Sequence, residues 1–281
     1  MAEIVAVYAV PHTPSFVAEV LQDGDRSETA QFFVKIRQHL ASVRADLIVT
    51  VNNDHFNTFF LDNLPTFAIG LADRTAGPND QTPGMPWYDV EVDAEAAAGL
   101  QRNFFNEGFD FSSTQEFQID HGALVPLHFM TPKMDLPIVP IFVNCVVPPL
   151  PSAARCYNLG RSLAKGIRAL SGRHEASRVA IVTSGSLSLE IGGPRAFEGK
   201  TFGVPDPDWA TWILDCVKSK DHQALIDAAT EARMLEAGNV AGELLNWMIA
   251  LGAVGRSLPD ILINQPELGN AFAAWSVGAQ S

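Results

Sequence analysis

The sequence predicts an α/β fold, in which helices flank a central mixed sheet and the active site lies in a crevice at the carboxyl ends of strands. Two patterns support this prediction. Short, nearly continuous apolar runs rich in valine and isoleucine recur along the chain, which is typical of strands buried on both faces. Segments with apolar residues at helical spacing separate these runs, and such alternation is the pattern of a layered α/β protein.

The elements follow from these patterns in order along the chain. Residues 3–10 and 46–52 are predicted strands because nearly all of their side chains are apolar, and Ser27 can cap a helix at 28–43. The other predicted strands are 66–71, 109–113, 136–147 and 178–183. The other predicted helices are 92–106, 152–171, 207–220, 221–229 and one that contains Glu243 and ends near residue 251. Loops are expected at 11–27, 72–89 and 184–195, and residues after 259 are left as a tail.

The length and the charge limit the kind of protein. At 281 residues we expect a single α/β domain over residues 1–281, with a possible internal boundary at the proline-rich residues 148–151. The 19 Lys and Arg residues against 32 Asp and Glu residues give a net charge of −13, which argues against nucleic acid or an anionic membrane as a partner. An anionic substrate is still compatible, because a local arginine or a metal can set the field in a pocket.

The cysteines and the N-terminal segment predict a cytoplasmic protein. Cys145, Cys156 and Cys216 are odd in number and lack metal-like spacing, which fits a reducing compartment better than a disulfide framework. The first apolar run is short and is broken by Pro11, His12 and Pro14. We therefore expect neither a signal peptide nor a membrane span there.

Three side chains suggest a metal site. His12 and His55 each follow a predicted strand, and ligands gather beyond the carboxyl ends of strands in open α/β sheets. Glu243 lies on an apolar helical stripe, where an unpaired carboxylate is costly unless a cation binds it. Two histidines and one carboxylate form the ligand set of non-haem Fe(II) oxygenases. The alternative is that the histidines are packed or on the surface and that Glu243 faces solvent.

A set of motifs, in this order, resembles the class III extradiol ring-cleavage dioxygenases over about residues 5 to 275. The motifs are His-x-Pro at 12–14, Asn-Asp-His at 53–55, Asp-His-Gly at 120–122, Gly-Pro-Arg at 193–195 and Gly-Glu-x-x-x-Trp at 242–247. The resemblance implies that His12, His55 and Glu243 hold Fe(II) (Fe2+), and that the partners are O2 and an aromatic small molecule. It also implies an oligomer, either of identical chains or with a small second subunit.

The resemblance further favours His121 as the catalytic acid/base, since Asp120 before it can orient the ring. The structural alternative is that Asp120 caps a helix and His121 is merely packed. Three residues are candidates for substrate binding: Arg195, Ser188 and Asn270. Arg195 could pair with a substrate carboxylate or form a structural ion pair, and neither is preferred. Asn270 is suggested because the family's tail lines the substrate end of the pocket.

One residue departs from the family pattern. The family carries a catalytic histidine in a segment that reads approximately Gly-Gly-x-Ser-His, and here Leu189 occupies that position. Leucine can neither donate nor accept a proton. Several explanations are open: His121, Ser188 or Glu190 takes over, the substrate is already activated or is not a catechol, or the leucine is an engineered replacement. The chain could also be a non-catalytic partner of an active subunit.

The function expected from these observations is Fe(II)-dependent extradiol cleavage of a catechol or a related ortho-substituted phenol. Two alternatives use the same residues: a non-catalytic or regulatory partner subunit, and a metal-dependent hydrolase with zinc at the triad. A hydrolase would turn over without O2, and a partner subunit would purify without metal.

Overall fold

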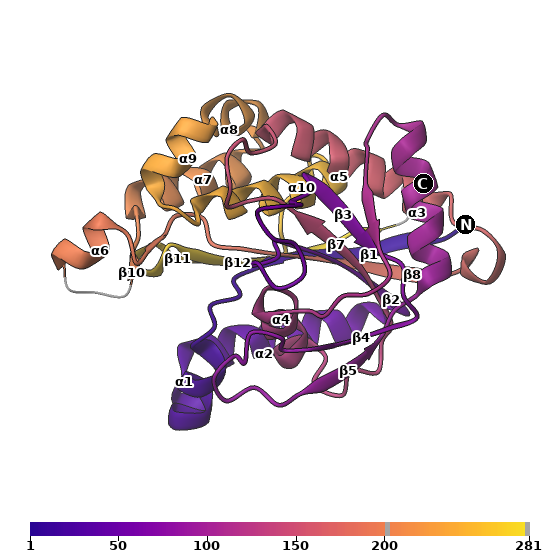
Figure 1. Ribbon diagram of the computed structural model, residues 1–281, viewed down its shortest axis with the longest axis horizontal. Helices are drawn as coiled ribbons and strands as arrows, with labels where there is room; N and C mark the ends of the chain where they lie inside the picture. Colours follow the sequence, from indigo (N-terminus) through magenta and orange to yellow (C-terminus); the bar gives the residue numbers. More distant parts are fainter. Residues whose placement is uncertain (200–202, 279–281) are drawn as a thin grey trace.

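The protein, described here by a computed structural model over residues 1–199 and 203–278, is built on one eight-stranded sheet (Figure 1). The strand order is β11-β12-β1-β8-β2-β7-β3-β6. Their bounds are β1 Glu3–Val10, β2 Leu47–Asn52, β3 Phe67–Gly70, β6 Ser112–Thr114, β7 Ile138–Val143, β8 Arg178–Ser184, β11 Ile261–Gln265 and β12 Asn270–Ser276. Two short ribbons lie outside it, β4 Arg74–Gly77 with β5 Tyr88–Glu91, and β9 Glu190–Ile191 with β10 Gly203–Val204.

The sheet is mixed, as predicted. At its centre β1, β8, β2 and β7 run parallel to one another. At one side β12 runs antiparallel to β1, and at the other β3 runs antiparallel to β7. Because the central strands are parallel, the segments that follow β1, β2 and β8 leave the sheet at the same edge.

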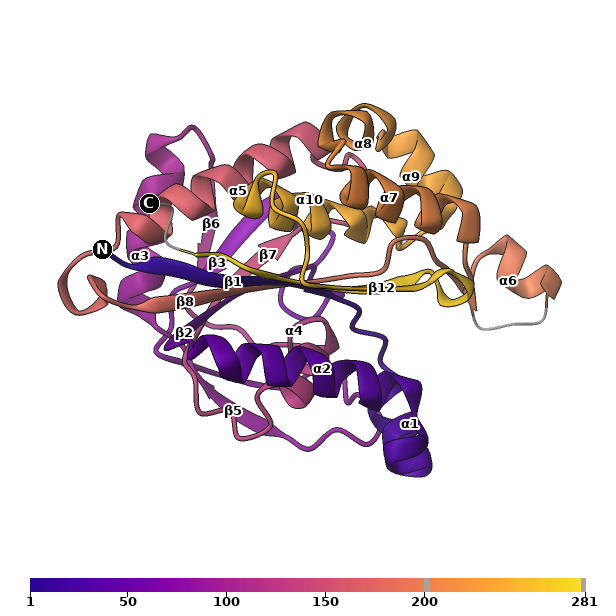
Figure 2. The same ribbon diagram turned by 180° about the vertical axis from the view of Figure 1, so that it is seen from behind.

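Helices cover both faces of the sheet (Figures 1 and 2). The buried side chains of α1 Phe16–Asp23, α2 Glu28–Val43 and α4 His121–Met130 form a core with one face. The other face packs against α3 Ala94–Asn106, α5 Ala153–Arg168 and α10 Leu244–Val254, with α7 Pro207–Ser219, α8 His222–Ala228 and α9 Glu231–Ala237 beyond. A further helix, α6 Pro194–Gly199, lies outside both layers.

The apolar runs recognised in the sequence reflect this double coverage. Along β1, Ala6, Tyr8 and Val10 belong to one core. Val7 and Ala9 belong to the other. Successive side chains of a strand point to opposite faces, so a strand covered on both faces must be apolar throughout.

Helix α10 is buried along its whole length and packs closely against α5. A Cβ atom added at Gly160 would lie 2.0 Å from the carbonyl oxygen of Ile249, and one at Gly252 would lie 2.0 Å from that of Tyr157. Only glycine allows the two backbones to approach this closely. This contact fixes the position of α10, and with it the turn that precedes α10.

Several elements were not predicted. Helix α1 lies in the expected loop 11–27, the β4–β5 ribbon in the expected loop 72–89, and β11 and β12 in the expected tail. The predicted strand 109–113 is only partly correct, because β6 begins at Ser112. Phe109 and Phe111 are buried instead as rings that pack against Phe67. No helix in residues 1–199 and 203–278 is long and apolar enough to cross a membrane.

Candidate metal centre and adjoining cavity

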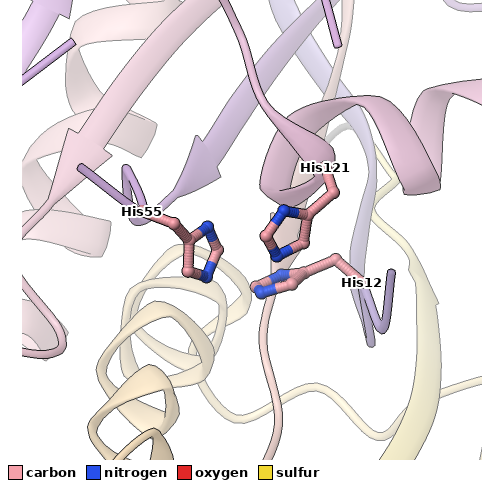
Figure 3. A group of neighbouring side chains, drawn as sticks. All are labelled: His12, His55 and His121. Carbon is pink, nitrogen blue, oxygen red and sulfur yellow. The ribbon is translucent and has the colours of Figure 1, made fainter. Parts of the chain in front are cut away.

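Three histidines from distant parts of the chain meet at the edge where the central strands end (Figure 3). His12 follows β1, His55 follows β2 and His121 begins α4. The rings of His55 and His121 stack with centroids 4.0 Å apart. The ring of His12 lies 5.2 Å from that of His55 and 5.4 Å from that of His121. One ring nitrogen of each lies within 4.8 Å of the others, which is close enough for one metal ion.

Glu243, from the C-terminal part of the chain, lies beside the three histidines. Its Oε1 lies 3.1 Å from Nε2 of His12 and 3.5 Å from Nε2 of His55. Its Oε2 accepts a hydrogen bond from the backbone N–H of Ser186 at 2.6 Å. Glu243 was expected within a helix, but it lies in a 3-10 turn, Ala241–Glu243, directly before α10. The turn aims the carboxylate at the histidines.

Each histidine is oriented by a partner at its Nδ1 atom. His12 Nδ1 lies 3.0 Å from the hydroxyl of Ser184, and His55 Nδ1 lies 2.9 Å from the carboxylate of Asp120. His121 Nδ1 forms a hydrogen bond with the carboxylate of Asp80. A carboxylate only accepts, so Nδ1 of His55 and His121 carries the proton. Their Nε2 atoms are then the ones available to a metal or a substrate, as in metal sites with outer hydrogen-bond partners.

The same conclusion holds for His12. The Ser184 hydroxyl has one proton and donates it to the carbonyl oxygen of Gly122 at 2.5 Å. It therefore accepts from Nδ1–H of His12, which leaves Nε2 with a lone pair. This lone pair faces Oε1 of Glu243 at 3.1 Å, and two acceptors at that distance require a cation or a proton between them. The donor set fits a divalent metal ion.

The electrostatics of the site favour positive charge. Burial alone would lower the pKa of His55, but Asp120 and Glu243 outweigh it and raise the pKa to about 10. Burial alone would raise the pKa of Glu243, but His12 and His55 outweigh it and hold that pKa well below its usual range. Both carboxylates are thus strong acceptors of positive charge at the point where the histidines meet.

His121 differs from the other two histidines. Burial, followed by the charge of His55, lowers its pKa in spite of the hydrogen bond to Asp80. A neutral His121 with its proton on Nδ1 presents a basic Nε2 atom. Asp80 is itself held by the hydroxyl of Thr82 at 2.8 Å. The sequence did not point to Asp80, although it is the acidic residue of the Gly-Pro-Asn-Asp turn in the long loop expected at 72–89.

Asn53 also belongs to the candidate metal centre, because it contacts His55 and Glu243. It is fully buried, and its Nδ2 lies 2.8 Å from Nε2 of His55 and donates a hydrogen bond to Oε1 of Glu243 at 3.3 Å. Its Oδ1 has no hydrogen-bond partner within the described part of the chain. The amide therefore touches two of the three proposed ligands, although only its position in the Asn-Asp-His motif marked it in the sequence.

A cavity of about 550 Å³ adjoins the group and includes all three histidines and Glu243 in its wall. Much of the wall is apolar, and its main apolar side chains are Pro14, Phe16, Leu189, Ile191, Val240 and Leu268. Cavities of this size hold small organic ligands. Leu189, which stands where the family carries its histidine, forms part of this apolar wall.

The predicted substrate-binding residues differ in their positions. Asn270 lines the cavity, and its Nδ2 donates to the hydroxyl of Thr13 at 3.3 Å. Ser188 is buried away from the cavity wall, and its hydroxyl donates to the carbonyl oxygen of Asp206 at 3.0 Å. Arg195 is also not part of the wall, and its Nε pairs with Glu190 at 2.8 Å. Of the two roles considered for Arg195, the structure records the ion pair.

The chain belongs to the family described as the catalytic LigB subunit of aromatic ring-opening dioxygenase, whose model matches residues 6–271. This confirms the resemblance to class III extradiol dioxygenases. A similar relative is a 2,3-dihydroxyphenylpropionate/2,3-dihydroxicinnamic acid 1,2-dioxygenase from Klebsiella pneumoniae subsp. pneumoniae, 30% identical over 183 residues, which cover 65% of this chain and 55% of that one. The match thus spans about half of that protein.

A second relative, the 2,3-dihydroxyphenylpropionate/2,3-dihydroxicinnamic acid 1,2-dioxygenase 2 from Pseudomonas putida, is 29% identical over 288 residues, which cover 88% of each chain. Among solved structures, the uncharacterized protein JW3007 from Escherichia coli K12 has a TM-score of 0.64 and 19% identity, and the match covers 96% of this chain and 99% of that one. This likeness confirms the predicted α/β fold.

Proposed function

We propose that this chain is an Fe(II)-dependent extradiol dioxygenase that opens the ring of a catechol or a related ortho-substituted phenol. The observation that carries the proposal is the convergence of Nε2 of His12, Nε2 of His55 and Oε1 of Glu243 beside a cavity of about 550 Å³. Family membership supports it, because the matching family consists of aromatic ring-opening dioxygenases. The relatives' printed names refer to ring compounds with two hydroxyl groups, which supports a catecholic substrate.

We assign His12, His55 and Glu243 as the metal ligands. Two imidazoles and one carboxylate suit Fe(II), and bound Fe(II) would supply open positions for O2 and for the ring oxygens of the substrate. Asp120 and Ser184 hold the two ligand rings by their Nδ1 atoms, so each Nε2 keeps its direction before the metal arrives.

We assign His121 as the acid/base. Three groups could replace the histidine that the family carries at position 189: His121, Ser188 and Glu190. Ser188 bonds to the backbone of Asp206 and Glu190 pairs with Arg195, and neither lines the cavity. His121 does line it. With Asp80 at Nδ1, its Nε2 can accept a proton from a substrate hydroxyl and return it later.

The wider setting of the enzyme is part of the same proposal. A single domain is supported by the sheet, because strands before and after residues 148–151 belong to it. A cytoplasmic location is supported by Cys145, Cys156 and Cys216, which are free and buried. An oligomer, of identical chains or with a small second subunit, is supported by the exposed apolar side chains of Phe56, Phe60 and Leu61 next to His55.

The proposal is tested by anaerobic loading with Fe(II), followed by O2-electrode measurements with catechol, protocatechuate, gallate and aminophenols. We expect about one Fe(II) per chain, since one triad holds one ion, and O2 consumption with at least one of these compounds. Glu243→Gln should abolish metal binding, whereas Glu236→Gln, an exposed glutamate outside the cavity, should not. Turnover without O2, or unchanged iron binding in Glu243→Gln, would refute the proposal. The hydrolase and partner-subunit alternatives are not favoured by the family match.

A further inference from the structure

Apart from the proposed metal centre, the charged side chains described in the cavity wall are all negative. Besides Glu243, two carboxylates line it, Glu19 and Glu267. Within residues 1–199 and 203–278, no lysine or arginine lines it. A group that reaches this part of the cavity from the metal centre therefore meets acceptors and negative charge.

Hydrogen bonds from neighbouring side chains hold Glu19 in the cavity wall. It lies in α1 and is half-buried, and its Oε1 accepts hydrogen bonds from the hydroxyls of Ser27 at 3.1 Å and Thr29 at 3.2 Å. These bonds tie α1 to the start of α2, which is a structural role. Both hydrogen bonds are accepted by Oε1. The second carboxylate oxygen, Oε2, can therefore accept a hydrogen bond from a ligand in the cavity.

Glu267 approaches the cavity from a different element. It lies in the 3-10 turn Pro266–Leu268 between β11 and β12, and its side chain is exposed. The next residue, Leu268, lines the cavity as well. The two carboxylates thus come from separate segments of the chain, and both line the cavity that adjoins the candidate metal centre.

Two arginines on described segments that adjoin the cavity are paired with carboxylates. Arg195 Nε lies 2.8 Å from Oε2 of Glu190. Arg233 Nη2 lies 2.8 Å from Oδ2 of Asp206, and its guanidinium lies over the ring of Trp209. Neither is part of the cavity wall. A carboxylate on the substrate would therefore lose its hydration here without gaining a counter-charge from the described side chains of the wall, which is unfavourable.

We propose that the substrate of this site carries, away from its two ring oxygens, a protonated amine or an uncharged hydrogen-bond donor in place of a carboxylate. This inference rests on the proposed function, because the metal centre is what holds the ring end of the substrate. Glu19 and Glu267 are the specificity-determining residues: they attract an ammonium group and repel an anion. The apolar wall that includes Leu189 accommodates the ring and the aliphatic linker.

The test compares three catechols that differ at the end of one side chain: 4-(2-aminoethyl)catechol, 4-ethylcatechol and 3-(3,4-dihydroxyphenyl)propionate. Their dissociation constants are measured anaerobically by calorimetry on the Fe(II)-loaded 281-residue chain, so the readout is binding and not turnover. We expect the amine to bind roughly tenfold more tightly than the carboxylate, with the ethyl compound between them. The difference should shrink as salt is raised, because salt screens partly exposed charges.

Variants that remove one negative charge test whether Glu19 and Glu267 cause the preference for the amine. Glu19→Gln can still accept from Ser27 and Thr29, and Glu267→Gln is at an exposed site, so both should fold. Each should reduce the amine preference about threefold, and the double variant should remove it. The control Glu236→Gln removes the same charge outside the cavity and should change nothing.

The outcomes distinguish failure of the charge preference from failure of the proposed ring-opening function. Equal binding of the three compounds, or tighter binding of the carboxylate, overturns the charge preference and leaves the ring-opening function standing. A preference that persists in the double variant also overturns it. If none of the three catechols binds, the charge preference is overturned, and the O2-electrode measurements with the other compounds decide the proposed function separately.

Discussion

Gly185 lies directly against Glu243: a Cβ atom built on Gly185 would be 2.6 Å from Cβ of Glu243 and 2.9 Å from its carbonyl oxygen. Gly185 follows β8, so this contact brings the end of a central strand against the turn that carries the carboxylate. The carboxylate can reach the histidines only because position 185 has no side chain.

The first prediction concerns this contact. Gly185→Ala should push the Ala241–Glu243 turn away from the histidines, lower the affinity for Fe(II) or Co(II) by about 10 to 100-fold, and destabilise the fold by about 1–3 kcal/mol. Metal titration followed spectroscopically and urea unfolding measure the two effects. Gly278→Ala is the matched control, since nothing lies within 4 Å of the added Cβ atom there. Wild-type metal affinity in Gly185→Ala would show that the turn tolerates displacement.

The second prediction separates metal ligands from the acid/base. Asp120→Asn removes the charge behind His55, a proposed ligand, and should lower metal affinity about 10 to 100-fold. Asp80→Asn makes the same change behind His121, a proposed acid/base, and should leave metal affinity within about twofold while kcat falls about 10²-fold or more. Metal titration and steady-state O2 uptake of both variants give the comparison. Equal losses of metal affinity would mean that His121 is itself a ligand.

The third prediction concerns Leu189. Leu189→His places an imidazole in the cavity wall where the family has one, and if proton transfer limits the rate, kcat should rise about tenfold or more. Leu189→Asn is the control, because an amide is polar and of similar size but does not transfer protons at neutral pH. A rise in both variants would exclude proton transfer as the cause, and no rise in either would mean that His121 alone suffices.

The fourth prediction concerns acid stability. Burial alone would raise the pKa of Asp120, but the charge of His55 and the hydrogen bonds donated to the carboxylate hold that pKa well below its usual range. The unfolded chain therefore binds more protons than the folded one as the pH falls below about 4, and the stabilisation by Asp120 is lost there. The pKa of His55 is raised to about 10, so its contribution is complete below about pH 6.5 and is lost as the pH rises toward 10.

In the presence of a chelator, the free energy of unfolding should consequently depend less on pH in Asp120→Asn than in the wild type, both below pH 4 and above pH 6.5. Asparagine can still cap α4 as Asp120 does through the N–H of Gly122, so the comparison reports the charge. Urea unfolding across this range is the measurement. Parallel pH profiles for the two proteins would contradict the prediction.

The sequence predicted the central strands and the positions of two of the four residues at the candidate metal centre for clear physical reasons. Strands buried on both faces produce continuous apolar runs, and His12 and His55 could be placed at their ends without knowing the pairing. Glu243 was placed by its apolar surroundings and the family motif, but in a helix, because a 3-10 turn that leads into a helix has no separate sequence signal.

The residues that sequence reasoning missed depend on long-range contacts. Asp80 reaches His121 because the backbone N–H of Asn79 donates to the carbonyl oxygen of Ile119 and brings the loop against α4. Helix α4 itself is apolar on all sides and contains Pro126, so it has no helical periodicity. The two interpretations considered for residues 120–121 are compatible, since Asp120 caps α4 and His121 still lines the cavity.

The distance along the chain between His12 and Glu243 has a consequence for biosynthesis. The first histidine is made early, and its carboxylate partner follows 231 positions later. Nascent chains that have not yet released α10 from the ribosome cannot form the complete binding site, however well their N-terminal half is folded. The proposed iron site should therefore form only after Glu243 has emerged, and products truncated before that residue should not bind iron there.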